Sequence, residues 1–177
     1  DNVIDLAPFI PMEFPGERDA LERWLNAAFL NRPADVSGFL SALSAAIHDA
    51  FSYSRREARG TQSAMTTVAN QSGTCRDFAF LFMECARLFG FAARFVTGYL
   101  HVREDRDDGT KGGGSTHAWA DVYLPGEGWV EFDPTNLIER NQALIRIAVT
   151  RTPAQATPIS GTYDHGQGQF LDMTVDV

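Results

Sequence analysis

Three side chains of this 177-residue chain are of the types that carry out nucleophilic catalysis together. Cys75 follows a Gly-Thr turn and opens a long apolar run, so its thiol is expected at a helix N-terminus, where the helix dipole favours a thiolate. His117 begins an alternating stretch typical of a strand, and Asp133 precedes Pro134, which stops a second strand. A thiolate nucleophile, an imidazole base and a carboxylate that orients the imidazole suffice for acyl transfer.

The helix that begins at Cys75 is expected to be the central helix of the fold. The polar residues between positions 75 and 89 are Arg76, Asp77, Glu84 and Arg87. The rest is apolar, which predicts burial on several sides before Gly90 ends the helix. Arg76 and Asp77 are interpreted as an ion pair or cap at the helix start, because an acidic first turn suits the helix dipole. Cys85 lies too far along the helix to pair with Cys75 and is interpreted as core.

Two amphipathic helices are predicted upstream, over residues 19–30 and 35–53, because apolar side chains recur there at helical spacing. His48 lies beside the apolar stripe of the second helix. A lone histidine in that position is usually a hydrogen-bonded structural group, so we assign it no catalytic role.

Beyond Gly90 the sequence changes to the period-two pattern of strands. The predicted strands are residues 92–102, 116–124, 128–134, 143–151 and 169–177. Helices followed by strands with short turns predict an α+β fold with a mostly antiparallel sheet. Residues 103–115 form a charged, Gly-rich loop without the context of a phosphate-binding or calcium-binding loop.

The strands over 116–124 and 128–134 are predicted to form a hairpin that brings His117 near Asp133. Pairing Leu124 with residue 129 would set His117 opposite residue 136, with Asp133 a few residues away. The carboxylate could then fix the imidazole tautomer while the other ring nitrogen takes the Cys75 proton. The tryptophans Trp119 and Trp129 are expected to pack the sheet, or alternatively to wall a cleft.

Attack on an amide also requires hydrogen-bond donors for the oxyanion. The backbone N–H of Cys75 at the helix end is one candidate, and the side chain of Asn70 or Gln71 is the other. No spacing rule selects between the two amides, and both could equally belong to a surface loop.

Composition limits the class of protein and partner. A chain with 44% hydrophobic and 21% charged residues is expected to be one globular domain over residues 1–177. A net charge of -8 argues against nucleic acid or an anionic membrane surface as partner. Two cysteines and the lack of a recognisable signal peptide or membrane span predict a cytoplasmic protein.

These segments together resemble the bacterial transglutaminase-like family. The matching phrases are GTCRDFA, RLFGFAARFVTGYL, THAWADVYLPGEGWVEFDPTN and IRIAVTR, and the resemblance covers about residues 10–177. It implies a papain-like triad of Cys75, His117 and Asp133, on a helix packed against an antiparallel sheet. The family usually has His at the position of Phe80. Its larger members carry a β-rich segment before this core, so the chain is expected to be a fragment of a longer protein.

The sequence therefore predicts a cysteine protease or amidase that forms a thioester acyl-enzyme on peptide or side-chain amide bonds, with a peptide or protein substrate and without cofactor or metal. Hydrolysis is favoured over amine transfer, because the Gly-rich loop before His117 would not seal the cleft from water. Three alternatives remain open: a true protein-glutamine transglutaminase, a non-catalytic peptide-binding module, and a metal site built from Cys75, His117 and Asp133.

Overall fold

The fold is α+β, as predicted, with helices first and a five-stranded sheet after them. The computed structural model describes residues 3–29, 32–55, 60–101, 111, 116–140, 142–157, 161, 164 and 166. The helices are α1 (Val3–Leu6), η1 (Ala7–Phe9), η2 (Pro15–Glu17), α2 (Arg18–Ala28), α3 (Val36–Ala50), α4 (Ala64–Asn70), α5 (Cys75–Leu88) and η3 (Pro153–Ala156). The strands are β1 (Ser52–Tyr53), β2 (Ser72–Gly73), β3 (Ala93–Leu100), β4 (Thr116–Leu124), β5 (Gly128–Asp133), β6 (Ile138–Glu139) and β7 (Leu144–Thr150).

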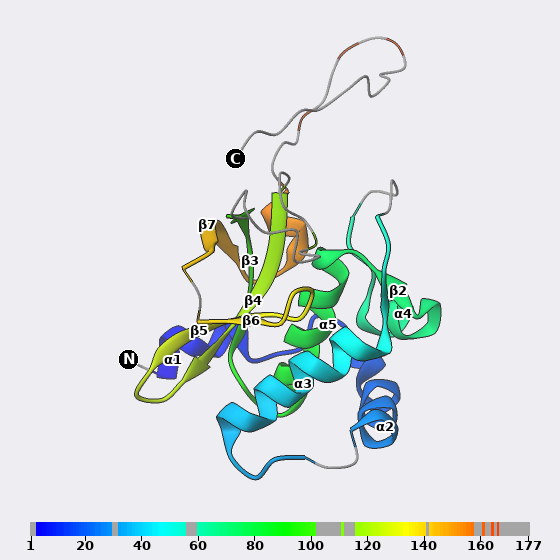
Figure 1. Ribbon diagram of the computed structural model, residues 1–177. Coiled ribbons are helices and arrows are strands. Elements are labelled where there is room, and N and C mark those ends of the chain that lie inside the picture. Colours follow the sequence, from blue (N-terminus) through cyan, green and yellow to red (C-terminus); the bar gives the residue numbers. More distant parts are fainter. Residues whose placement is uncertain are drawn as a thin grey trace.

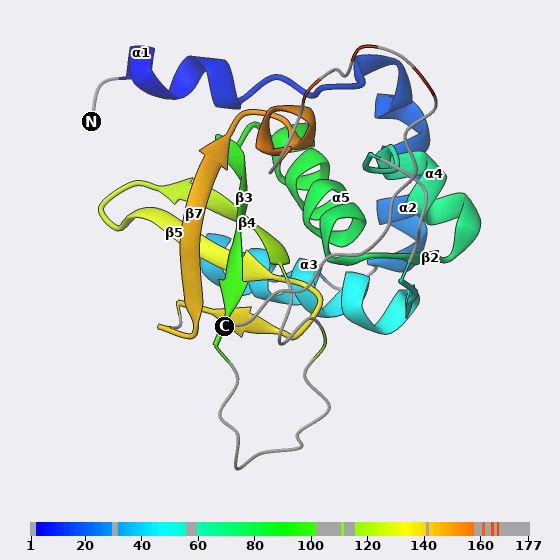
Figure 2. The same ribbon diagram turned by 90° about the horizontal axis from the view of Figure 1, so that it is seen from above.

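The main sheet has the strand order β6-β5-β4-β3-β7, and all its neighbouring strands are antiparallel. Helix α5 lies along one face of this sheet, and α2 and α4 lie on the far side of α5 (Figures 1 and 2). The helix is thus enclosed between the sheet and the other helices. This position explains why most of its side chains are apolar and buried, and it confirms the prediction of a central helix.

Strand β4 shows how the sheet separates its two faces. Ala118, Ala120 and Val122 belong to the main core that includes α5. Trp119 belongs to a smaller apolar cluster on the opposite face, as the alternation of side chains along a strand requires. His117 shares the face of Trp119, because the two rings stack with centroids 6.3 Å apart.

The β4–β5 hairpin has a register one residue different from the predicted one. Leu124 pairs with Gly128, so the predicted pairing of Leu124 with residue 129 was wrong. The reason is a three-residue loop, Pro125 to Glu127, with Gly126 and Gly128 at positive φ. A shift of one residue exchanges the faces of a strand. The observed register places Asp133 on the same face as His117.

The predicted helix over 35–53 is too long at its C-terminus. Helix α3 ends at Ala50, and Ser52–Tyr53 instead forms strand β1, which pairs in parallel with β2. The predicted helix over 19–30 corresponds to α2, which ends at Ala28. Helix α4 was not predicted, because its seven residues carry no long apolar stripe.

Two predicted features lie largely outside the described residues. The predicted strand over 169–177 lies wholly outside them, and of the loop over 103–115 the structure describes only Lys111.

A buried ion pair ties the far end of α5 to the rest of the chain. Arg87 Nη1 lies 3.2 Å from Glu84 Oε1, and both side chains are almost fully buried. Glu84 also accepts hydrogen bonds from the backbone N–H of Glu13, and Arg87 donates to the carbonyl oxygens of Phe9 and Ala93. Because each charge has several partners, the pair connects segments about 70 residues apart in the sequence without an unpaired buried charge.

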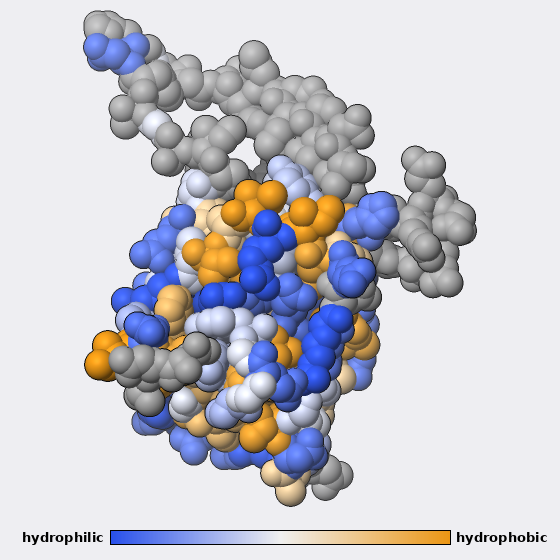
Figure 3. Space-filling model, turned by 90° about the vertical axis from the view of Figure 1, so that its left-hand side faces the viewer, coloured by the Kyte–Doolittle hydropathy of each residue, from blue (hydrophilic) through white to orange (hydrophobic). Residues whose placement is uncertain are grey.

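Strand β7 borders the sheet and exposes Ile145, Ile147 and Val149. Figure 3 views the side of the molecule where Figure 1 places β7, and it shows hydrophobic groups beside strongly hydrophilic ones. Among the described helices, none is both long enough and apolar enough to span a membrane.

Candidate active site

Cys75 is the first residue of α5, and its position is fixed by the capping of that helix. The backbone N–H and the hydroxyl of Thr74 both donate to Asp77 Oδ2 at 2.9 Å. The backbone N–H of Gln62 donates to the other carboxylate oxygen at 2.7 Å. Asp77 is fully buried, so these bonds act in a low-dielectric setting. The prediction that Asp77 caps the helix is confirmed, and its result is a fixed backbone at the thiol.

Arg76 points toward the C-terminal part of the described chain. Its Nη2 donates to the carbonyl of Pro153 at 2.8 Å, and its guanidinium lies 5.0 Å from the centroid of Phe95. Burial lowers the pKa of Arg76, while the charges of Cys75 and Asp77 act in the opposite direction. The residue therefore anchors the start of α5 to η3 and adds positive charge near the thiol.

His117 and Asp133 form a buried, hydrogen-bonded pair. His117 Nε2 lies 2.7 Å from Asp133 Oδ2, and both side chains are fully buried. Asp133 also accepts from the backbone N–H of Thr135 at 2.9 Å and from Asn136 Nδ2 at 3.0 Å. Three hydrogen-bond partners therefore fix the position of the carboxylate. The pair can therefore hold the imidazole in one orientation.

The other ring nitrogen of His117, Nδ1, takes no part in the hydrogen bond with Asp133. Nδ1 is buried and has no partner of normal hydrogen-bond geometry among the described residues. Burial alone would lower the pKa of His117, but its hydrogen bond to Asp133, the nearby Cys75 and the charges of both residues raise it to about 10. Thr97 Oγ1 donates to the His117 carbonyl at 3.1 Å, which fixes the backbone as well. The structure thus brings Cys75, His117 and Asp133 together, with the imidazole in the middle.

His48 supports this site from α3. Its Nδ1 lies 3.1 Å from the carbonyl oxygen of Thr135, the residue whose N–H bonds Asp133. The sequence predicts a structural role for His48, and this hydrogen bond agrees with it.

The two predicted oxyanion amides lie at the surface. Asn70 is exposed, and its Nδ2 donates to Gln62 Oε1. Gln71 is also exposed and ends α4 in the left-handed conformation, with φ 51°. Neither position favours contact with the buried Cys75 thiol. The backbone N–H of Cys75 keeps the predicted place, at the first position of the helix.

Tyr53 is a residue near the site that sequence reasoning missed. Its ring packs edge-on against Phe78, one turn after Cys75, with centroids 6.4 Å apart. Burial and the charge of Cys75 raise the pKa of the Tyr53 phenol, Arg55 lowers it, and Asp133 raises it. Its one signal in the sequence is an aromatic side chain directly after a helix.

The remaining predicted residues pack the fold. Trp119 is fully buried, and Trp129 contacts the guanidinium of Arg94 at 4.1 Å from its ring centroid. Phe80, at the position where the family usually has His, is buried and packs edge-on against Phe14 at 5.9 Å between centroids. Cys85 is fully buried, and this burial raises its pKa well above the ordinary value. These observations assign all four residues to packing.

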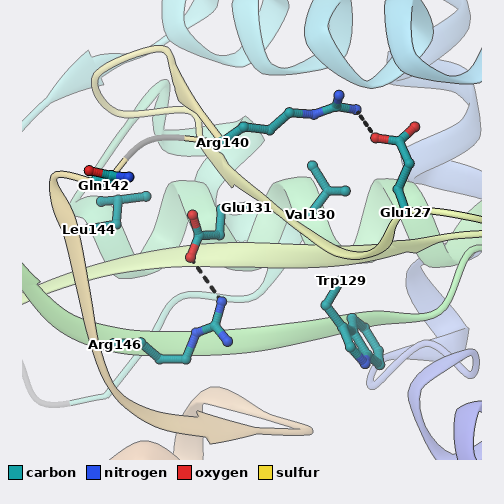
Figure 4. Close-up of a pocket in the computed structure, with 8 residues that line it drawn as sticks. All are labelled: Glu127, Trp129, Val130, Glu131, Arg140, Gln142, Leu144 and Arg146. Carbon is teal, nitrogen blue, oxygen red and sulfur yellow. Dashed lines mark hydrogen bonds and ion pairs between the residues drawn. The ribbon is translucent and has the colours of Figure 1, made fainter.

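A hollow on the outer side of the sheet, which Trp129 helps to line, includes none of Cys75, His117 and Asp133. Figure 4 shows it with the helices behind the strands. Two ion pairs span it, Arg146 with Glu131 and Arg140 with Glu127, each at 2.8 Å. The four charged side chains among its described lining residues are thus paired with one another, which does not favour a catalytic role for them.

Comparison with known proteins finds relatives of this chain. Two uncharacterized mycobacterial proteins are similar: one from Mycobacterium bovis is 30% identical over 92% of this chain and 54% of its own length. One from Mycobacterium leprae is 34% identical over 65% of this chain and 40% of its own length. The chain thus spans about half the length of these relatives.

Solved structures share the fold. A structure described as "a Putative Cysteine Protease from Cytophaga hutchinsonii" has a TM-score of 0.67 and 28% identity, covering 86% of this chain and 49% of that one. The periplasmic domain of TgpA from Pseudomonas aeruginosa shares the fold alone, with a TM-score of 0.50 and 23% identity over 74% of this chain and 48% of that one. The model of the transglutaminase-like superfamily matches residues 25–134, a range that begins in α2 and ends just after Asp133. The chain therefore belongs to the transglutaminase-like superfamily.

Proposed function

We propose that this protein is a cysteine-dependent acyl-transfer enzyme that acts on amide bonds of peptides or proteins. Cys75 is the nucleophile, His117 transfers the proton, and Asp133 orients the imidazole. The observation that carries the proposal is the place of His117 between the other two residues: its Nε2 lies 2.7 Å from the buried Asp133, and Cys75 is near enough to raise the pKa of the ring. That arrangement matches the roles of base and orienting group in acyl transfer.

The protonation state of His117 gives the reaction its starting point. With a pKa of about 10, the imidazole is protonated at neutral pH, and a cation beside the thiol favours the thiolate. The Cys75 sulfur attacks the amide carbonyl carbon, and the carbonyl electron pair moves to oxygen. When this pair returns, the carbon–nitrogen bond breaks, and His117 gives its proton to the leaving amine. The neutral imidazole then takes a proton from the water that cleaves the thioester.

The chemistry of the proposed nucleophile and proton donor, together with one structural neighbour, supports a choice of substrate class. A thiolate with a proton donor for an amine leaving group suits amide bonds, and the Cytophaga hutchinsonii neighbour is described as "a Putative Cysteine Protease". Peptide or protein substrates are therefore proposed for this chain. Among the described residues, no cluster of three or more His, Cys, Asp or Glu is arranged to hold a metal ion. His117 Nε2 lies 2.7 Å from Asp133 Oδ2 and is engaged in that hydrogen bond, which also disfavours a shared ion.

Hydrolysis is proposed as the main fate of the acyl-enzyme. Amine transfer requires the acceptor to reach the thioester before water. The segment before His117 is rich in glycine and charged residues, a composition that suits an open cleft edge better than a closed amine channel.

Product partition tests this proposal. A reactive glutamine-containing peptide or ester is incubated with enzyme across a titration of a primary amine, and acid and amide products are counted by mass spectrometry. At millimolar amine we expect acid to exceed amide about tenfold or more. Dominant amide at low amine would instead make the protein a transglutaminase. The Cys75→Ala variant, which must release neither product, is the control, and Cys85→Ala should behave like the wild type.

A further inference from the structure

We infer that the hydroxyl of Tyr53 donates a hydrogen bond to the oxyanion that forms when Cys75 attacks an amide carbonyl, beside the backbone N–H of Cys75. This inference rests on the proposed function and adds a catalytic residue to it. Negative charge that develops on the carbonyl oxygen needs two donors in a site that excludes water. The predicted side-chain donors, Asn70 and Gln71, are both exposed.

The pairing of β1 with β2 decides where the Tyr53 side chain points. Ser52 N donates to Gln71 O at 3.0 Å and Ser54 N to Gly73 O at 2.9 Å, which makes Gly73 the register partner of Tyr53. Paired residues in adjacent strands project to the same face. The direction in which Gly73 would carry a side chain is therefore also the direction of Tyr53.

The missing side chain of Gly73 faces the first turn of α5. A Cβ built on Gly73 would lie 2.8 Å from Asp77 Cβ and 3.0 Å from a ring carbon of Phe78. Tyr53 projects to this same side, and its edge-on contact with Phe78 agrees with this direction. The phenol thus extends along the helix turn that begins with Cys75, only two residues after Gly73.

A second contact places Tyr53 beside the loop that holds Asp133. Lys111 Nζ lies 5.7 Å from the centre of the Tyr53 ring. The backbone of Lys111 exchanges two hydrogen bonds with the Asn136 side chain, at 2.8 and 3.0 Å, and Asn136 Nδ2 donates to Asp133. The ring is therefore held between the nucleophile helix and the carboxylate loop.

The electrostatics and the competing amide agree with this role. Burial and the charges of Cys75 and Asp133 outweigh Arg55 and raise the pKa of the phenol, so it stays a donor at neutral and mildly alkaline pH. Gln62 is the other half-buried amide near the helix start, but its Nε2 donates to Ser72 O and its Oε1 accepts from Asn70. Both ends of that amide are occupied.

The test compares two reactions of the same thiol in the Tyr53→Phe variant. Acylation by a peptide ester builds an oxyanion, whereas alkylation by iodoacetamide does not. We expect kcat/KM for the ester to fall about 10²- to 10³-fold, mainly through kcat, because one oxyanion donor is lost. The alkylation rate should stay within about twofold, because the ring and its packing remain. Tyr99→Phe, on β3, is the matched control and should leave both rates unchanged.

Each other outcome has a separate meaning. Wild-type acylation in Tyr53→Phe would overturn the inference and leave the proposed function intact. An equal fall in acylation and alkylation would show that Tyr53 only positions the thiol, which also overturns it. Failure of the wild-type protein to acylate at Cys75 would overturn the proposed function itself.

Discussion

Asp133 holds His117 through a 2.7 Å hydrogen bond between two fully buried side chains. The two residues come from adjacent strands of the central sheet, β4 and β5, and share one face because of the observed hairpin register. Asn136 and the Thr135 backbone donate to the same carboxylate. The orientation of the imidazole is therefore set by the pairing of two strands in the central sheet.

Replacing Asp133 by Asn should lower kcat/KM by about 10³- to 10⁴-fold while the protein remains folded. The amide can present an N–H to His117 Nε2, which selects the wrong tautomer. Steady-state kinetics and circular dichroism measure the two effects. Asn136→Ala removes only one of the donors to the carboxylate, so its loss should be much smaller. Equal losses in the two variants would contradict the orienting role of Asp133.

The raised pKa of His117 predicts a pH dependence of stability. An unperturbed imidazole titrates at 6.5; burial would lower this pKa, but Asp133 and Cys75 raise it to about 10 in the folded protein. Because the folded state binds the proton more tightly, this stabilisation is fully present below pH 6.5 and lost as the pH rises through about 10.

Urea unfolding at several pH values tests the direction of this pH dependence of stability. The free energy of unfolding of the wild-type protein should fall, relative to His117→Gln, between pH 6.5 and about 10. Parallel curves for the two proteins over this range would show that His117 gains no proton affinity on folding.

The two thiols should differ strongly in reactivity. Cys75 opens a helix beside His117, whereas Cys85 is fully buried in mid-helix and burial raises its pKa well above the ordinary value. Limiting iodoacetamide at neutral pH should therefore label Cys75 well before Cys85, as read by peptide mapping. Under denaturing conditions both should react. Preferential labelling of Cys85 in the folded protein would argue against the assigned nucleophile.

The capping of α5 should matter more for stability than that of α4. Asp77→Ala leaves the backbone donors of Thr74 and Gln62 without their carboxylate, so we expect a loss of about 2–4 kcal/mol in the free energy of unfolding. Ser63→Ala removes the exposed cap of α4, where Ser63 Oγ accepts from Thr66 N, and should cost about 1 kcal/mol. Chemical denaturation measures both. A smaller loss for Asp77→Ala than for Ser63→Ala would contradict this ranking.

The features that were predictable from the sequence are those with long patterns. The apolar run after Cys75 and the alternation after Thr116 each extend over nine or more residues, and they identified α5 and β4. The hairpin register was missed by one residue, because loop length rather than strand pattern sets it. Tyr53 was read as the end of a helix, since a two-residue strand has no period of its own. Its partner β2 is likewise two residues long, so no local sequence pattern indicated that the two strands pair.

Contacts between segments that are distant in the sequence could not be predicted from the sequence either. Nothing local to Asn136 indicates that its side chain bonds both Asp133 and the backbone of Lys111. Such contacts depend on how distant segments fold together, and a single sequence does not record them.

Mass-spectrometric mapping of a trapped acyl-enzyme tests the central claim most directly. A peptide ester is mixed with the protein, and the reaction is quenched in acid within one turnover. The masses of the intact protein and of its proteolytic peptides are then measured. We expect one added acyl group on Cys75, present in Cys85→Ala and absent in Cys75→Ala. An acyl group on another residue, or turnover that persists in Cys75→Ala, would contradict it.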